Sequence, residues 1–273
     1  IREEFLFMSE NADSTLPKRP HHADAAPGTR VNLMRAFTKK GIASRTQARE
    51  WILQGRVRVN GKVEKFVYAW VDLEHDVIAL DDQPLDRLSQ KLYILFHKPV
   101  GYLTARVDLQ NRPTIYDLLP SFATWVFPVG RLDMDSEGLL ILTNDGPFGE
   151  TLSHPDSHVA KTYRVQIDRR LRDKDRRRME NGIDLGGYIT RPAQVKALPG
   201  EEGTHWIEMI IHEGKNRQVR RMLKAVDYRV LRLLRTHIGS VALADLPAGQ
   251  WRHLTPAELA ELQIKDKPAN SPE

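Results

Sequence analysis

The 273-residue chain contains no cysteine, which excludes disulfide bonds and cysteine-ligated metal sites. No apolar run approaches the roughly 18 residues needed to cross a bilayer, so we expect a cytoplasmic protein with no membrane partner. The sequence also has no phosphate-binding glycine fingerprint, which argues against a doubly wound fold and a nucleotide cofactor. What the chain has instead is a formal net charge of +5, which favours a polyanionic partner.

The most informative segment runs from Pro128 to Gly146. A charged stretch, residues 130–138, leads into the apolar run Leu139–Thr143, and we call this stretch the acidic loop. Because the apolar run is short and follows a glycine, it predicts a buried strand rather than a helix. Asp133 would then lie beside a low-dielectric core, where a carboxylate is costly unless it is paired or used in chemistry.

Two common uses of such a loop do not fit the residues. The stretch Asp133–Gly138 starts like a calcium loop, but the twelfth position is Asn144 instead of Glu and apolar residues precede it. Asp133 and Asp135 would be about 7 Å apart on a regular strand, within the range of inverting glycosidases. The acidic loop has no aromatic residue on which a sugar could stack, so we predict neither site.

The same residues resemble a known signature. Gly130-Arg131-Leu132-Asp133, with Ser136 and Gly138-Leu139-Leu140 after it, is similar to the active-site motif of bacterial ribosomal-RNA pseudouridine synthases. Further motifs of that family follow in the expected order, and they are His97–Tyr102, Lys161–Val165, Gly214–Met222 and Gly249–Arg252. The resemblance covers roughly Val31 to Leu262.

The resemblance implies the isomerisation of a specific uridine to pseudouridine in ribosomal RNA. The glycosidic bond breaks, the uracil turns, and carbon 5 joins the ribose. No redox step or external group is involved, so we expect no cofactor and no metal. The base must be extruded from the RNA, which costs a few kcal/mol of unstacking. The implied fold is α+β with a mixed, largely antiparallel sheet flanked by helices, which agrees with the lack of strict strand–helix alternation.

The resemblance also implies roles for individual residues. Asp133 is the expected catalytic residue, and Arg220 is the expected cation that pairs with it, because burial alone would raise the pKa of the carboxyl. Tyr163 is expected to stack on the uracil and to handle protons. Arg131 would fill the gap left by the flipped base or grip its phosphate. The residues of this region expected to bind RNA are Arg131, Lys161 and Arg217.

Residues 31–80 predict a compact module. Ser44 to Gln47 has the pattern of a capping box, with Gln47 three residues after the cap, and Asn60-Gly61 predicts a tight hairpin. The segment resembles the small RNA-binding domain first described in a ribosomal small-subunit protein, although its first helix opens Val31–Met34 where relatives carry basic residues, which predicts a weaker or shifted RNA affinity. Its exposed cations would either clamp phosphates or form a solvated surface, and those expected to bind RNA are Arg45, Arg49, Arg56 and Arg58.

The composition also predicts how the chain is divided. We expect a disordered tail at 1–30, the S4-like RNA-binding module at 31–80, a linker at 81–90, a catalytic domain at 91–264 and a C-terminal tail at 265–273. The expected partner is ribosomal RNA, naked or in a subunit assembly intermediate, bound by a monomer. The alternative is an RNA-binding ribosome assembly factor without catalysis.

Overall fold

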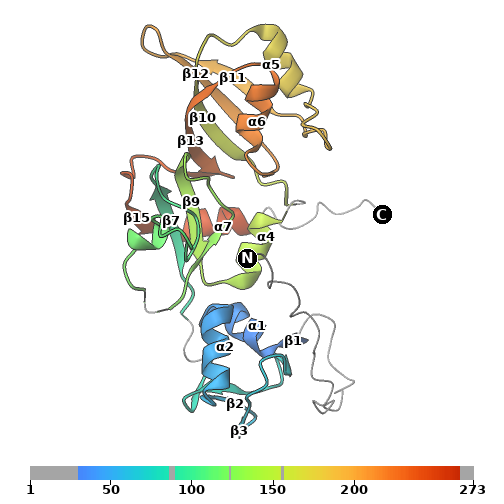
Figure 1. The fold of residues 1–273 in the computed structure, drawn as a ribbon, viewed down its shortest axis with the longest axis vertical. Helices are drawn as coiled ribbons and strands as arrows, with labels where there is room; N and C mark the ends of the chain where they lie inside the picture. Colours follow the sequence, from blue (N-terminus) through green and yellow to red (C-terminus); the bar gives the residue numbers. More distant parts are fainter. Residues whose placement is uncertain (1–29, 86–89, 123, 155–156, 265–273) are drawn as a thin grey trace, which may run out of the picture.

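The computed structural model describes residues 30–85, 90–122, 124–154 and 157–264. The predicted N-terminal tail apart from Arg30, the C-terminal tail and positions 86–89 of the predicted linker lie outside these residues. The described chain forms a small N-terminal module and a larger body built on a nine-stranded sheet (Figure 1). The predicted domain boundaries stay predictions.

The N-terminal module combines two helices with short strands. Its elements are β1 (Arg30–Asn32), α1 (Leu33–Lys39), α2 (Arg45–Leu53), β2 (Val57–Val59), β3 (Lys62–Val63), β4 (Trp70–Asp72), β5 (Ile78–Leu80) and β6 (Gln83–Pro84). β1 pairs with β4, and the other strands form a sheet in the order β3-β2-β5-β6. β6 lies within the predicted linker, because Asp81 and Asp82 adopt left-handed conformations that turn the chain back onto β5.

The hairpin in this module forms as the sequence predicts, and the predicted capping box forms only in part. The Ser44 side chain accepts a hydrogen bond from the Gln47 backbone at 3.2 Å and caps α2, although the Gln47 side chain donates to Glu50 instead of completing a capping box. Asn60 and Gly61 both have positive φ, as the predicted hairpin turn between β2 and β3 requires.

The larger body is a mixed sheet. Its strands are β7 (Tyr93–Lys98), β8 (Phe127–Val129), β9 (Glu137–Thr143), β10 (Lys161–Ile167), β11 (Gln194–Leu198), β12 (His205–Ile211), β13 (Val230–Ile238), β14 (Val241–Ala242) and β15 (Trp251–His253). The order is β11-β12-β10-β13-β9-β7-β15, with β14 on β13 and β8 on β9. Every pair is antiparallel except β9 with β13, which confirms the predicted α+β fold.

Helices cover both halves of the sheet. They are η1 (Ile115–Asp117), α4 (Gly146–Ser153), α5 (Asp173–Glu180), α6 (Gln218–Ala225) and α7 (Pro256–Ile264). Side chains of α5 and α6 share one apolar core with β10 and β12, whereas α4 and α7 share another with β7 and β9. Among the described helices, none is long and apolar enough to cross a membrane.

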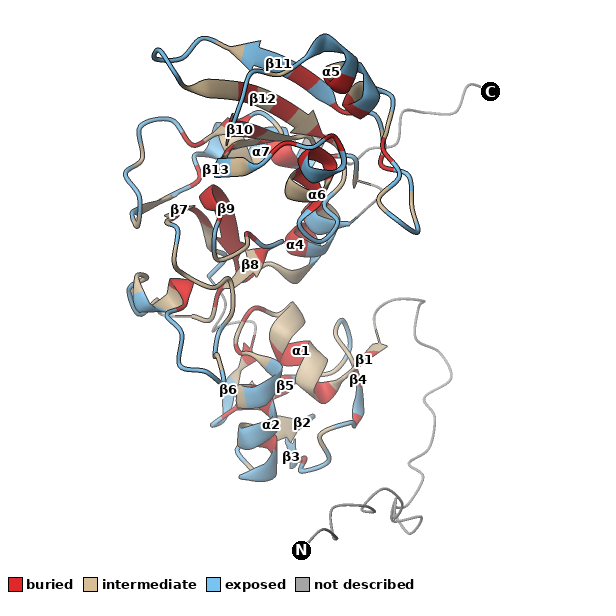
Figure 2. Ribbon diagram, turned by 45° about the horizontal axis from the view of Figure 1, so that its top comes forward, coloured by how far each residue is buried: buried red, intermediate tan, exposed pale blue. Residues whose placement is uncertain are grey.

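Strand β9 is buried along its whole length (Figure 2). Leu139 and Ile141 pack into the core beneath α4, and Leu140 and Leu142 pack on the opposite face against η1. Burial on both faces explains why the strand is a continuous apolar run and not an alternating one. The acidic loop thus leads into a buried strand, as predicted.

Gly138 brings this strand against β13. It has φ of +114°, and a Cβ atom there would lie 2.3 Å from the backbone oxygen of Arg235. Only glycine permits so close an approach without distorting the chain. The contact fixes the end of the acidic loop beside Arg235, which is the register partner of Gly138 in the parallel pairing.

The module and the body touch directly. The Thr124 hydroxyl donates a hydrogen bond to the Gly41 backbone oxygen at 2.6 Å. Gly41 has φ of +72°, and a Cβ atom there would lie 2.3 Å from the Asn144 backbone oxygen. Arg35 forms an ion pair with Glu150 at 3.2 Å, so that α1 and α4 are joined across this contact.

Candidate active site

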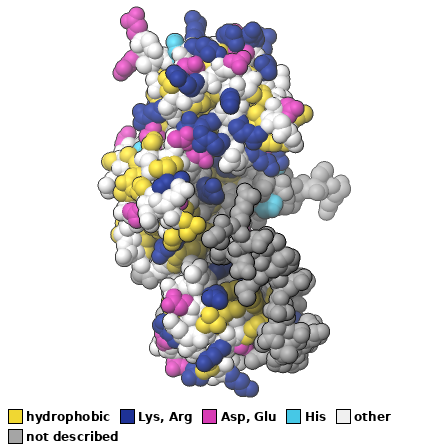
Figure 3. All heavy atoms as spheres, viewed as in Figure 1, with side chains coloured by type: hydrophobic (Ala, Val, Ile, Leu, Met, Phe, Trp, Pro, Cys, Tyr) yellow, Lys and Arg dark blue, Asp and Glu magenta, His cyan; other side chains and the backbone are white. Residues whose placement is uncertain are grey.

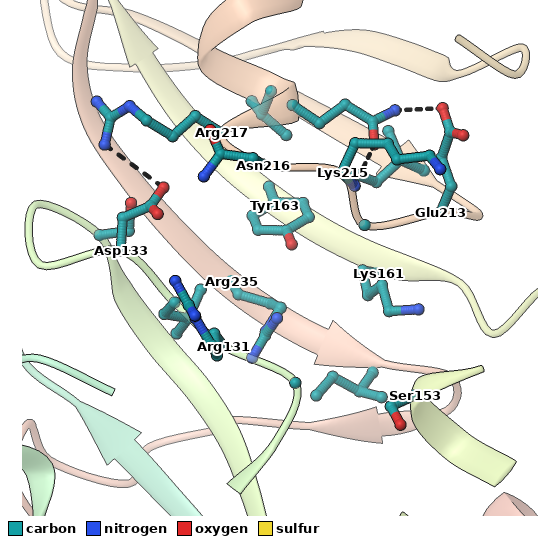
Figure 4. Close-up of a pocket in the computed structure, with 18 of the residues that line it drawn as sticks. Arg131, Asp133, Ser153, Lys161, Tyr163, Glu213, Lys215, Asn216, Arg217 and Arg235 are labelled. Carbon is teal, nitrogen blue, oxygen red and sulfur yellow. Dashed lines mark hydrogen bonds and ion pairs between the residues drawn. The ribbon is translucent and has the colours of Figure 1, made fainter. Parts of the chain in front are cut away.

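A cavity of about 640 Å³ opens in the body between the acidic loop, β10, β13 and the segment leading into α6 (Figure 4). It brings together side chains that are far apart in the sequence. The predicted site residues that line it are Arg131, Asp133, Lys161, Tyr163 and Arg217. Arg220 lies beside it on α6, in contact with the acidic loop.

Lys98, the last residue of β7, binds the backbone of the acidic loop. The side chain of Lys98 is fully buried, and its ammonium donates to the backbone oxygens of Pro99, Asp133 and Ser136 at 3.0, 2.9 and 2.7 Å. Burial lowers the pKa of Lys98 to about 8, against the opposing effect of the loop carboxylates. An ammonium with three donors thus fixes the backbone on which Asp133 stands.

Arg217 contacts two of the three carboxylates of the loop, those of Asp135 and Asp133. Its guanidinium donates to the two oxygens of Asp135 at 3.0 and 2.8 Å, and it lies 3.5 Å from a carboxylate oxygen of Asp133. This bidentate bond lowers the pKa of Asp135. Arg217 has a left-handed backbone conformation at the N-cap of α6, which a non-glycine residue adopts at a cost of about 1–3 kcal/mol.

Arg220 takes a different partner from the one predicted. Its ion pair is with Asp135 at 3.3 Å, and it also donates to the Asp135 backbone oxygen at 2.6 Å. We expected Arg220 to pair with Asp133, but the ion pair with Asp133 is made by Arg217. The left-handed backbone of Arg217 at the start of α6 places its side chain next to the loop. Arg220 is the more buried of the two arginines, and burial lowers its pKa.

Tyr163 forms one wall of the cavity. It is 8% exposed and belongs to the apolar core that contains Leu132, so its ring is held firmly in place. In Figure 4 the ring lies between Asp133 on one side and Lys161 on the other. Among the described residues its hydroxyl has no hydrogen-bond partner, which leaves it available to a ligand.

Arg235 is a cavity residue that sequence reasoning missed. It is the register partner of Tyr163 on the adjacent strand, so both side chains project from the same face of the sheet. Arg235 is 4% exposed, donates through Nε to the Leu139 backbone oxygen at 2.7 Å, and leaves Nη2 without a partner in the described chain. No carboxylate among the described residues forms an ion pair with it.

Lys161 shares this positive corner. It lies two residues before Tyr163 on β10, and its ammonium donates to the Val159 backbone oxygen at 3.0 Å. Burial and the nearby charge of Arg235 lower the pKa of Lys161 to about 8. Two cations that have no carboxylate partner among the described residues thus face one cavity, and such an arrangement attracts an anion.

The four cations predicted in the N-terminal module lie outside the cavity. Arg56 is exposed, Arg58 is partly exposed, and they form surface ion pairs with Asp81 and Asp82. Arg45 and Arg49 are exposed on α2. Figure 3 shows Lys and Arg side chains most numerous over the upper part of the molecule, where β10 to β13, α5 and α6 lie. In the described ranges no group of three or more His, Asp or Glu side chains is arranged to hold a metal ion.

Comparison with protein families gives two matches. A family model described as RNA pseudouridylate synthase matches residues 92–225, and one described as S4 domain matches residues 37–65.

Individual relatives cover most of the chain. An uncharacterised RNA pseudouridine synthase of Aquifex aeolicus is 37% identical over 233 residues, which are 85% of this chain and 93% of that protein. The ribosomal large subunit pseudouridine synthase B of Bacillus subtilis is 36% identical over 233 residues, 85% of this chain and 95% of its own. A crystal structure of a pseudouridylate synthase matches with a TM-score of 0.63 at 30% identity, covering 85% of this chain and 99% of that one.

Proposed function

Since the chain belongs to the RNA pseudouridylate synthase family and carries an S4 domain, it is an isomerase, and we propose that it converts a specific uridine of ribosomal RNA to pseudouridine with Asp133 as the essential carboxylate. The observation that carries this proposal is the position of Asp133 at the edge of the cavity, opposite the ring of Tyr163. The RNA is naked or part of an assembly intermediate, and the enzyme acts as a monomer with a module at 31–80 and a catalytic domain at 91–264.

Two arginines flank the Asp133 carboxylate. Arg217 lies 3.5 Å away, but its two shorter bonds go to Asp135, so the Asp133 carboxylate stays available to the substrate. Arg220 places a second positive charge next to this loop, where it forms an ion pair with Asp135. Both attack on a sugar carbon and abstraction of a sugar proton use a carboxylate with a free oxygen, and Asp133 offers one at the edge of the cavity.

Tyr163 is suited to hold the base while it is detached. A flat aromatic wall stacks on uracil and lets the ring turn in its own plane. In the reaction the bond from ribose to N1 breaks, the bond from ribose to carbon 5 forms, carbon 5 loses its proton and N1 gains one. The free hydroxyl of Tyr163 is a suitable acid–base group for these proton movements.

Lys161 and Arg235 form the anion-binding corner of the site. A phosphate of the target nucleotide would satisfy the free Nη2 of Arg235 and compensate both charges. This contact anchors the sugar while its base is released. Arg131, exposed where the acidic loop begins, would enter the space left by the flipped base or grip its phosphate.

The S4 domain would add affinity without reading sequence. Its exposed arginines, Arg45, Arg49 and Arg56, and the partly exposed Arg58 would pair with phosphates and orient the RNA on the catalytic domain.

The test is release of tritium from uridine labelled at carbon 5 in bacterial ribosomal RNA. Wild-type protein should release tritium, and Asp133→Asn should release none while binding the RNA within a few-fold of wild type. Both naked RNA and immature subunits are offered as substrates. No release by the wild-type protein from either would contradict the proposal and favour an assembly factor without catalysis.

A further inference from the structure

A second cavity, of about 330 Å³, lies between the S4 domain and the catalytic domain. Three cations, Arg35, Lys39 and Arg45, line it from the S4 side, and two aromatic rings, Trp125 and Phe127, line it from the catalytic side. We name the space between these residues the junction pocket. We propose that it binds a nucleotide that flanks the target uridine on the same RNA strand, with the base stacked on the aromatic pair and the phosphate held by Lys39 and Arg45.

The aromatic side of the junction pocket is built to present flat rings. The centroids of Trp125 and Phe127 are 5.3 Å apart, and their planes are inclined by 33°. Phe127 lies against Gly149 of α4, where a Cβ atom would come within 2.7 Å of the ring. Because glycine stands there, the ring can rest on the helix. Every base has a π-face, so such a pair stacks bases with little sequence preference.

Trp125 has a further property that favours a ligand. Its indole Nε1 is enclosed and has no hydrogen-bond partner in the described part of the chain. An enclosed donor without an acceptor is unfavourable, so a small rotation of the ring that gives Nε1 an oxygen partner is favoured. A nucleotide offers such oxygens on the base, the sugar and the phosphate. A purely apolar ligand would leave the donor as it is.

The charges of the junction pocket suit a phosphate. Arg35 is paired with Glu150 at 3.2 Å, which neutralises the carboxylate that lines the pocket. Lys39 and Arg45 form no ion pair with any described residue, so three cations less one carboxylate leave a formal charge of +2. Cations beside aromatic rings are the combination by which proteins bind single-stranded RNA.

The junction pocket adjoins the active-site cavity. Val129 and Ser153 line both of them, and the acidic loop begins directly after Val129. A strand whose target uridine enters the active-site cavity can therefore place a neighbouring nucleotide in the junction pocket. The hydrogen bond from Thr124 to Gly41 and the close contact of Gly41 with Asn144 hold the two walls together.

This inference rests on the proposed function, because it assumes an RNA substrate. The test measures binding of fluorescein-labelled oligouridylates of three and nine nucleotides to the full-length protein by anisotropy. The two substitutions that remove each half of the pocket are Trp125→Leu and Arg45→Gln. The matched control is Arg177→Gln, which removes an exposed arginine of α5 that lines neither cavity. Thermal unfolding shows whether each variant is folded. Because the Arg45 side chain is exposed, Arg45→Gln should fold normally and tests the pocket even if Trp125→Leu is unstable.

We expect each pocket variant to weaken binding of the nine-nucleotide RNA about tenfold and the control to change it less than twofold. A nine-nucleotide RNA carrying 5-bromouridine should cross-link under ultraviolet light to the segment that contains Trp125 and Phe127. Unchanged affinity in both variants, or cross-links confined to the active-site cavity, would overturn the inference. So would reduced turnover with unchanged RNA affinity. Failure of the proposed function is a separate result, since it appears as no tritium release by the wild-type protein.

Discussion

The arginines of the active-site cavity and those of the S4 domain differ in what holds them. Arg217, Arg220 and Arg235 are positioned by carboxylates, backbone oxygens and a buried strand. Arg49 is exposed on α2, and Arg56 forms a surface ion pair with Asp81 and lies 5.5 Å from the centroid of the Trp51 ring. A guanidinium held in one position can bond a particular atom of a ligand, whereas an exposed, mobile one contributes to the overall positive potential that attracts RNA. We therefore propose that the same residue type serves chemistry in one region and attraction in the other.

The largest effect should come from the carboxylates that the fixed arginines hold. Asp133→Asn should lower the rate of isomerisation by about a thousandfold or more, because the essential negative charge is lost. Asp135→Asn is the matched control, two residues away in the same loop. It should cost only about tenfold, since Asp133 keeps its charge although Arg217 can now close on it. Equal losses in single-turnover assays would mean that the two carboxylates share one role.

Removing the region of exposed arginines should act on binding. Deleting residues 1–80 should weaken binding to folded ribosomal RNA about a hundredfold and flatten its salt dependence, because phosphate contacts are lost. The measurement is filter binding from 50 to 300 mM salt, with circular dichroism to confirm that the catalytic domain stays folded. An unchanged affinity and salt slope would show that the S4 domain does not clamp RNA.

Arg235 offers a sharper test of the arginines that the structure holds in one position. Arg235→Met should raise KM about 10- to 100-fold, since a charged hydrogen bond to the substrate phosphate is lost. The Tm should equal or exceed that of wild type, because a buried cation without a carboxylate partner has been removed. Arg229→Met, at an exposed position just before β13, is the control and should change neither quantity. A large drop in Tm with unchanged KM would make Arg235 a structural residue.

The two lysines of the site should separate binding from turnover by pH. As the pH rises through about 8, Lys98 loses the third donor that holds the acidic loop, and kcat should fall up to about tenfold. Lys161 loses its charge over the same range, and KM should rise.

The effect of Lys98 on stability has the opposite sign. Its pKa is lowered from 10.5 in the unfolded chain to about 8 in the folded protein, so between these values the unfolded chain binds more protons. Its contribution to the free energy of unfolding therefore rises with pH across this window. Steady-state kinetics and urea unfolding at pH 7, 8 and 9 check both signs, and Lys98→Met should remove the dependence of kcat. A kcat that stays constant to pH 9 would contradict the role given to Lys98.

The smallest effect should come from a single exposed arginine. Arg49→Gln should weaken RNA binding about two- to threefold and reduce the slope of log affinity against log salt by about one. It should leave the rate at saturating RNA unchanged, because Arg49 lies outside the active-site cavity. A measurable loss of kcat at saturating RNA would show that Arg49 does more than attract RNA by its charge.

Much of this molecule could be predicted from local sequence patterns. The buried strand after the acidic loop, the N-cap at Ser44 and the hairpin at Asn60 depend on a few neighbouring residues, and each is present. The motif residues that line the cavity were also identified, because the family resemblance carries them as short, specific strings. The roles of Asp133, Tyr163 and Arg220 in catalysis remain predictions that the experiments above test.

Contacts between distant segments were decided only by the tertiary structure. Arg235 lies in the segment Leu234–Ile238, where the sequence alone would predict an exposed charged residue. It is buried because β10 and β9 pair with its strand on either side. Lys98 gives no sign in the sequence that it binds the acidic loop 35 residues later. The choice of Arg217 over Arg220 as the partner of Asp133 depends on a left-handed turn at one residue.

The sequence by itself thus determined the elements, the fold class and the motif that marks the site, since these follow from neighbouring residues and their periodicity. The tertiary structure decided which cations face the cavity, which one touches Asp133, and that a second pocket lies where the two domains meet. The physical reason is that burial and pairing depend on strand register and domain contact, and neither is encoded in any single stretch of the chain.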